Sequence, residues 1–159
     1  FLSCSADWTV KLWHRDYKKA LMTFDLGSSV GDVAWAPYSS TTFAAVTEDG
    51  KVHVFDLSIV KHDSLCRQAV IKKAKLTHVA FNPSEHIVMV SDDKGQVQTL
   101  KLSPNLRVIT PIRAEEGAQA TQAVAHLQAS LANPQARLDT EIAKLNEVLD
   151  IAIRTNDII

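Results

Sequence analysis

The sequence lacks every motif that would indicate catalysis. It contains no phosphate-binding glycine loop, no HExxH zinc motif and no nucleophile elbow. Its six histidines are scattered over different parts of the chain, and no pair of cysteines or histidines has the spacing of metal ligands. We therefore expect no enzymatic activity, no cofactor and no metal site.

A large net charge and long apolar runs are also missing. The formal net charge is −1 and the pI is about 6.6, so electrostatics gives no reason to expect nucleic acid as a partner. No run of about 18 apolar residues is present, so we expect no membrane partner. The two cysteines, Cys4 and Cys66, lie in strand-like apolar surroundings, which predicts reduced thiols in a reducing compartment.

What the sequence does contain is a repeat. The string TEDGKVHVFDL at Thr47–Leu57 has counterparts in SADWTVKLWH at Ser5–His14 and SDDKGQVQTLKL at Ser91–Leu102. A second marker, DVAWAP from residue 32, recurs as HVAFNP from residue 78, which is 46 residues later. A period of about 40 to 45 residues with several short strands per unit is typical of a WD-type propeller blade. The sequence thus predicts an all-β, WD40-type β-propeller, of which this chain holds the last two to three blades.

Alternating apolar residues predict the individual strands. The first unit has strands at Leu2–Ser5, Thr9–Trp13 and Ala20–Phe24; the second at Val33–Trp35, Phe43–Val46, Val52–Phe55 and Leu65–Ile71; the third at Val79–Phe81, Ile87–Ser91 and Val97–Leu102. The third unit has no fourth strand. That absence, together with a first residue that falls inside a strand, predicts a C-terminal fragment of a propeller protein.

The composition changes after residue 102. We predict blades at 1–102, a linker at 103–113 and an α-helical tail at 114–159, with a helix break near 133–134. In the first tail segment, Val124, Leu127 and Leu131 share one face. Asn133 and Pro134 suit the N-cap and first position of a new helix.

The second tail helix has one apolar stripe, formed by Leu138, Ile142, Leu145, Leu149 and Ala152. Glu141 and Lys144 can pair on the polar face. A helix of about 20 residues is marginal alone in water, so the stripe should have a partner. Two alternatives stay open: the helix packs on its own propeller or frays, or it enters a groove of another subunit.

Several exposed side chains are candidate protein-binding residues. Lys72, Lys73 and Lys75 form a basic run that is either a solvated loop or a docking patch. Trp8 lies at a turn tip, where it is either covered or an interface anchor. The full set of predicted protein-binding residues is Trp8, Lys72, Lys73, Lys75, Leu138, Ile142, Leu145 and Leu149.

The acidic residues of the turns also have two interpretations. Asp7, Asp49, Asp92 and Asp93 either accept backbone N–H groups and hold the hairpins, or form an acidic rim for a basic partner.

At this point the strings support a resemblance. SADWTVKLW resembles a WD-repeat core, and Phe55-Asp56 resembles the WD dipeptide. CSADWTVKLW, DVAWAPYSS and LKLSPNLR together resemble the C-terminal end of axonemal outer-arm dynein intermediate chains. The Gly-His pair of regular WD blades is missing, and Leu100-Lys101 stands at the dipeptide position of the last unit, so the hydrogen-bond network of such blades is not expected as a set.

The resemblance implies a non-catalytic scaffold role in a ciliary or flagellar motor. Proteins of this family use the propeller to grip a dynein heavy-chain tail, together with a second intermediate chain and light chains, and contact the doublet microtubule indirectly. Assembly in the cytoplasm and localisation to the axoneme are implied as well. The alternative from another class is a WD-repeat adaptor that presents clients to a complex such as a ubiquitin ligase.

Overall fold

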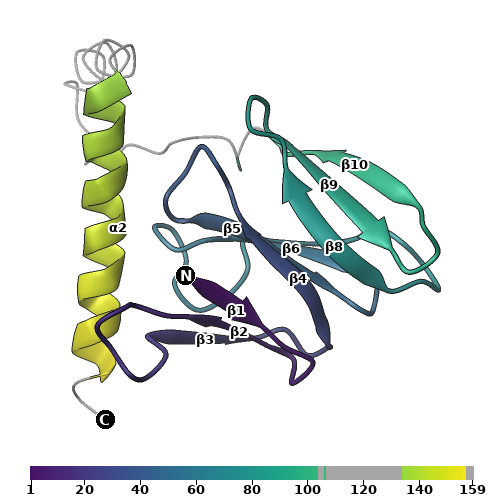
Figure 1. The fold of residues 1–159 in the computed structure, drawn as a ribbon, viewed down its shortest axis with the longest axis horizontal. Helices are drawn as coiled ribbons and strands as arrows, with labels where there is room; N and C mark the ends of the chain where they lie inside the picture. Colours follow the sequence, from purple (N-terminus) through teal and green to yellow (C-terminus); the bar gives the residue numbers. More distant parts are fainter. Residues whose placement is uncertain (104–105, 107–133, 157–159) are drawn as a thin grey trace, which may run out of the picture.

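The structure is a computed structural model that describes residues 1–103, 106 and 134–156. Its strands are β1 (Leu2–Cys4), β2 (Thr9–Leu12), β3 (Met22–Asp25), β4 (Val30–Trp35), β5 (Thr42–Thr47), β6 (Lys51–Asp56), β7 (Cys66–Ala69), β8 (Leu76–Phe81), β9 (Ile87–Asp92) and β10 (Val97–Lys101); the helix is α2 (Pro134–Asn156). Figure 1 shows three sheets side by side, with α2 along one side of the first two.

Each sheet is an antiparallel meander. The orders are β1-β2-β3, β4-β5-β6-β7 and β8-β9-β10, so only the second sheet has four strands among the described residues. This confirms the prediction of propeller blades followed by a helical tail. The predicted strands are all present, with ends that agree or differ by up to three residues; β3, for example, begins at Met22 rather than Ala20.

Strand pairing confirms the repeat register. Phe43 lies opposite Phe55, and their rings stack at a centroid distance of 4.6 Å. At the equivalent position of the first sheet, the rings of Phe1 and Trp13 are stacked at 6.1 Å. The Trp13 indole N–H also donates to the Ser3 hydroxyl at 2.8 Å, so one part of the WD-type hydrogen-bond network is present in the first blade.

The core consists of two apolar clusters on either face of the middle sheet. All six residues of β5 are buried. Phe43 and Ala45 belong to the cluster shared with the first sheet, whereas Ala44 and Val46 belong to the cluster shared with the third. Successive side chains of a strand point to opposite faces, so the four residues from Phe43 to Val46 are apolar on both faces, whereas the buried hydroxyl groups of Thr42 and Thr47 at the strand ends are hydrogen-bonded.

Three hairpin turns lie at one end of the sheets. Gly50 and Gly95 both have φ +80°, as expected for a residue that needs the left-handed region. Trp8 occupies the equivalent position in the first sheet, with φ 72°. The loops that follow β4, β6 and β8 lie at the other end, on the side of α2 (Figure 1).

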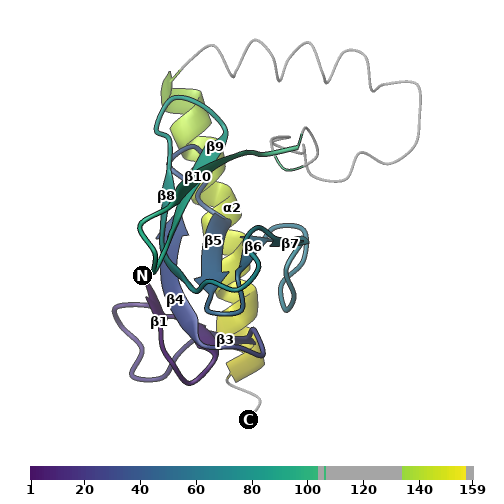
Figure 2. The same cartoon turned by 90° about the vertical axis from the view of Figure 1, so that its right-hand side faces the viewer.

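The tail helix α2 has 23 residues and begins at Pro134, where the sequence predicts a helix start. In both views it runs beside the sheets (Figures 1 and 2). The predicted apolar face of Val124, Leu127 and Leu131, most of the predicted linker and the predicted cap Asn133 lie outside the described residues.

The glycine turns provide a test of blade packing. A Cβ at Gly50 would overlap the carbonyl oxygen of Ile71, whereas a Cβ at Gly95 would meet no heavy atom within 4 Å. We expect Gly95→Ala to cost about 1–2 kcal/mol through its positive φ alone, and Gly50→Ala to cost more because the backbone of the next loop must also move. Thermal unfolding of both variants checks this. Equal losses would contradict the close approach.

Candidate functional site

The predicted protein-binding residues lie on two surfaces of the described part of the chain. Within residues 1–103, 106 and 134–156, no group of three or more His, Cys, Asp or Glu side chains could hold a metal ion. No helix in that part of the chain has the length and apolar character to cross a membrane. The two surfaces are the junction of α2 with the loop between β4 and β5, and the end of the sheets that bears the hairpin turns.

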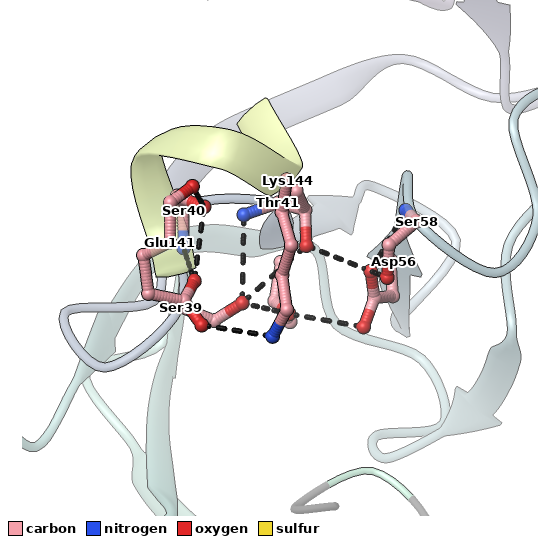
Figure 3. Close-up of polar contacts among 8 residues, drawn as sticks. Ser39, Ser40, Thr41, Asp56, Ser58, Glu141 and Lys144 are labelled. Carbon is pink, nitrogen blue, oxygen red and sulfur yellow. Dashed lines mark hydrogen bonds and ion pairs between the residues drawn. The ribbon is translucent and has the colours of Figure 1, made fainter. Parts of the chain in front are cut away.

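The first surface is the junction between α2 and the loop that joins β4 to β5. The backbone N–H of Ser40 donates to the Glu141 carboxylate at 2.8 Å. The Ser40 hydroxyl lies 2.8 Å from the Glu141 carbonyl oxygen and 2.9 Å from its carboxylate. Lys144 donates to the second carboxylate oxygen of Glu141 at 3.0 Å (Figure 3). Both side chains of this ion pair are only 13% exposed, so the predicted pair is confirmed but faces the blades rather than solvent.

Asp56, at the end of β6, stabilises the loop between β4 and β5 to which Glu141 binds. The Thr41 hydroxyl donates to one oxygen of Asp56 at 2.9 Å, and the backbone N–H of Ser58 donates to the same oxygen at 3.0 Å (Figure 3). Thr41 is itself buried. These bonds do not involve α2, so they hold the loop independently of Glu141, and little further ordering is needed for that side chain to bind.

Burial raises the pKa of Glu141, but the Ser40 N–H, Lys144 and the Ser40 hydroxyl outweigh that effect. The net result is a pKa below the ordinary value of 4.5. The docked helix therefore stabilises the ionised carboxylate.

Apolar side chains complete the junction further along α2. Val148 and Ala152 are buried in the core cluster of the first and second sheets, and Leu149 and Ile153 pack against it. Leu145 is half-buried. A small hollow of about 160 Å³ remains between Val148 and Met22. Of the two alternatives left open by the sequence, the structure shows packing of α2 on its own blades.

The beginning of α2 differs from the predicted stripe. Leu138 and Ile142 are 52% and 48% exposed. Leu138 borders an open groove of about 450 Å³ with Tyr38 and Pro83. The inward face at this level is formed instead by Glu141 and Lys144. The role of Leu138, Ile142, Leu145 and Leu149 as contacts to another subunit stays a prediction.

The second surface is the end of the sheets that bears the three hairpin turns, which we call the hairpin face. It comprises the turns after β1, β5 and β9 and the loops after β3 and β7, at residues 5–8, 48–50, 93–96, 26–29 and 70–75. Trp8 is 53% exposed, and Lys72, Lys73 and Lys75 are all exposed. The predicted binding residues thus fall on two separate surfaces, because the helical ones lie at the opposite end.

Ion pairs and backbone bonds organise the hairpin face. The Lys75 ammonium group lies 2.8 Å from the Glu48 carboxylate, which lowers the pKa of Glu48 and raises that of Lys75. Lys94 donates to the carbonyl oxygen of Lys73 at 2.8 Å. Of the three predicted lysines, Lys75 is therefore part of the face's own structure.

The aspartates of the turns stabilise the hairpins by accepting hydrogen bonds. Asp7 accepts from the hydroxyl and N–H of Thr9, which lower the pKa of Asp7. Asp92 accepts the N–H groups of Lys94 and Gln96 at 3.0 and 2.7 Å. Asp93 accepts the N–H of Lys75 at 3.1 Å. These contacts agree with the structural interpretation of the acidic residues.

His53 is the most perturbed histidine of the described residues, yet its surroundings are structural. The side chain is 1% exposed, and burial, followed by the charge of Arg67, lowers its pKa to about 4. Its Nε2 atom lies 3.3 Å from the Thr47 hydroxyl. A neutral ring fits this position within the blade.

Sequence reasoning missed Ser40 and placed Glu141 on the solvent side. No apolar period marks either residue. The available signal was the run of hydroxyl side chains from Ser39 to Thr42, which is unusual between two buried strands.

Sequence comparison finds homologues among dynein chains. The "Dynein intermediate chain 2, ciliary" of Heliocidaris crassispina is 65% identical over 112 residues, which cover 69% of this chain and 16% of that protein. The "Dynein, 78 kDa intermediate chain, flagellar outer arm" of Chlamydomonas reinhardtii is 48% identical over 155 residues, covering 97% and 20%. The "Dynein axonemal intermediate chain 1" of Bos taurus is 50% identical over 153 residues, covering 95% and 20%.

The chain thus spans about one fifth or less of the length of these relatives. No protein-family model matches it.

The junction predicts that Glu141 holds the helix. Replacing Glu141 by Ala removes the bonds to Ser40 and Lys144, and we expect docking of α2 to weaken by about 1–2 kcal/mol. Hydrogen exchange should then speed up in residues 134–156 but not in β5 and β6. The matched control is Glu147→Ala, because Glu147 is exposed on the same helix. Equal exchange in both variants would show that the junction does not hold α2.

Acid should release the same contact. Since the pKa of Glu141 is lowered when α2 is docked, its contribution is complete above the ordinary value of 4.5 and is lost as the pH falls through the lowered value. We expect the exchange protection of α2, corrected for intrinsic rates, to fall over that range in the wild type. In Glu141→Gln, which does not titrate, the drop should be smaller. A drop of the same size in the Gln variant would assign the acid effect to other groups.

Proposed function

This chain is a homologue of the axonemal dynein intermediate chains over nearly its whole length, and from that premise we propose that it is a non-catalytic scaffold subunit of ciliary outer-arm dynein. In this proposal its propeller grips the tail of a dynein heavy chain and helps to assemble and anchor the motor. A second intermediate chain and light chains are further proposed partners, and contact with the doublet microtubule is indirect.

The single observation that supports the proposal most is the 48% identity to a chain named for the flagellar outer arm, which extends over 97% of this chain and includes the tail. The relatives are named as ciliary, flagellar and axonemal chains, which confirms the expected localisation in the axoneme.

The fold suits a scaffold because it is stiff. The middle sheet is buried on both faces, and α2 is fixed to it by hydrogen bonds at one end and apolar packing at the other. A surface that is already ordered loses little conformational entropy when a partner binds. The loops on both ends of the sheets then present a broad area to a long partner such as a heavy-chain tail.

Co-purification tests the proposed function. We expect the full-length protein that contains this chain to capture a purified fragment of the outer-arm heavy-chain tail, in the presence of the second intermediate chain. A globular domain from the motor end of the same heavy chain serves as the matched control and should not be captured. If a folded propeller, confirmed by circular dichroism, captures neither fragment, the proposal is wrong.

A further inference from the structure

Trp8 stands where the other two repeats have glycine. The turn residues Trp8, Gly50 and Gly95 have φ angles of 72°, 80° and 80°. For a residue with a Cβ, the left-handed region is unfavourable because the Cβ approaches the neighbouring backbone. The other two repeats have glycine at this positive-φ position, so a bulky residue here is an exception to the local backbone preference.

Packing of the ring does not explain this exception. Trp8 is 53% exposed, and within the described part of the chain its ring contacts no other aromatic ring. The backbone of Trp8 has a structural role, since its carbonyl oxygen accepts the N–H of Leu26 at 2.9 Å. Glycine would supply that same bond at lower cost, so the hydrogen bond does not account for the tryptophan side chain.

The surface around Trp8 is continuous across the three blades. The turn of Trp8 is hydrogen-bonded to Leu26, at the start of the loop between β3 and β4. In the same loop, the carbonyl oxygen of Ser29 accepts the N–H of Glu48 in the second blade. Glu48 pairs with Lys75, and Lys75 bonds to Asp93 in the third blade. A partner lying along this line would therefore meet an ordered surface from Trp8 to the lysine loop.

Charge on this surface is uneven. Asp7 faces Lys11, Asp49 faces Lys51 and Glu48 faces Lys75. Within the described residues the ammonium groups of Lys72, Lys73 and Lys94 form no ion pair with a carboxylate, and Asp92 and Asp93 form none with a lysine ammonium group. Asp92 is buried, so the exposed and unpaired groups on the third-blade side are three ammonium groups and the Asp93 carboxylate, which leaves an excess of positive charge.

We propose that the hairpin face is a docking surface for an acidic polypeptide segment, with Trp8 as its apolar anchor and Lys72 and Lys73 as its electrostatic contacts. The segment carries a large apolar side chain that covers the Trp8 ring and carboxylates that face the lysines. This deepens the proposed function and rests on it, because it places the heavy-chain tail on the end of the sheets that α2 leaves open.

The sharpest test is Trp8→Gly in the full-length protein. Glycine relieves the unfavourable φ, so the variant should unfold at the same temperature as the wild type or higher. Capture of the heavy-chain tail fragment should nevertheless weaken at least about tenfold, as expected for loss of an interface tryptophan. The matched control is Tyr17→Gly, because Tyr17 is 41% exposed on the loop after β2, at the opposite end. It should bind like the wild type.

A charge reversal tests the lysines. K72E/K73E should weaken capture and reduce its salt dependence, whereas K18E/K19E, an equally exposed pair on the loop after β2, should not. If the wild type captures the tail and both hairpin-face variants do too, the docking surface is wrong while the proposed function stands. If the wild type captures nothing, both are wrong.

Discussion

The structure depends on one constraint, which is that β5 at the centre of the middle sheet places apolar side chains on both faces, from Phe43 to Val46. Every side chain of β5 is buried, and alternate residues join two different cores. Neither face can be left in water without exposing a large apolar area. The first and third sheets therefore pack against it.

The same constraint explains where α2 lies. The core between the first and second sheets is covered by Val148 and Ala152 at one end. Apolar contact alone is not directional, so it would let a helix slide along its axis. The bonds between Glu141 and Ser40 fix its position, since Ser40 belongs to a loop already held by Asp56 through Thr41. Apolar burial holds α2 against the sheets, and the hydrogen bonds of Glu141 fix its position along the helix axis.

How much of this the sequence predicts depends on what produces each feature. The strands and turns follow from local periodicity and from glycine, and they were predicted within a few residues. The inward face of α2 was predicted only in part, because at Glu141 and Lys144 the helix meets a hydroxyl-rich loop rather than an apolar surface. The contact between Glu141 and Ser40 joins residues that are 101 positions apart in the sequence. Such a contact depends on the tertiary fold, and the periodicity of apolar residues gives no sign of it. Exposure of Trp8 was one of two open alternatives, and its backbone conformation became visible only beside Gly50 and Gly95.

The two ends of the sheets therefore differ in what contacts them. At one end, the chain's own helix α2 binds the loop of Ser40 and packs Val148 into the core of the first two sheets. The other end keeps an exposed tryptophan in an unfavourable backbone conformation and lysines without carboxylate partners among the described residues. Natural sequences agree with local preferences wherever folding alone decides the residue. The disagreement at the exposed turn of Trp8, beside two glycine turns that follow the rule, therefore supports the proposed contact with another molecule.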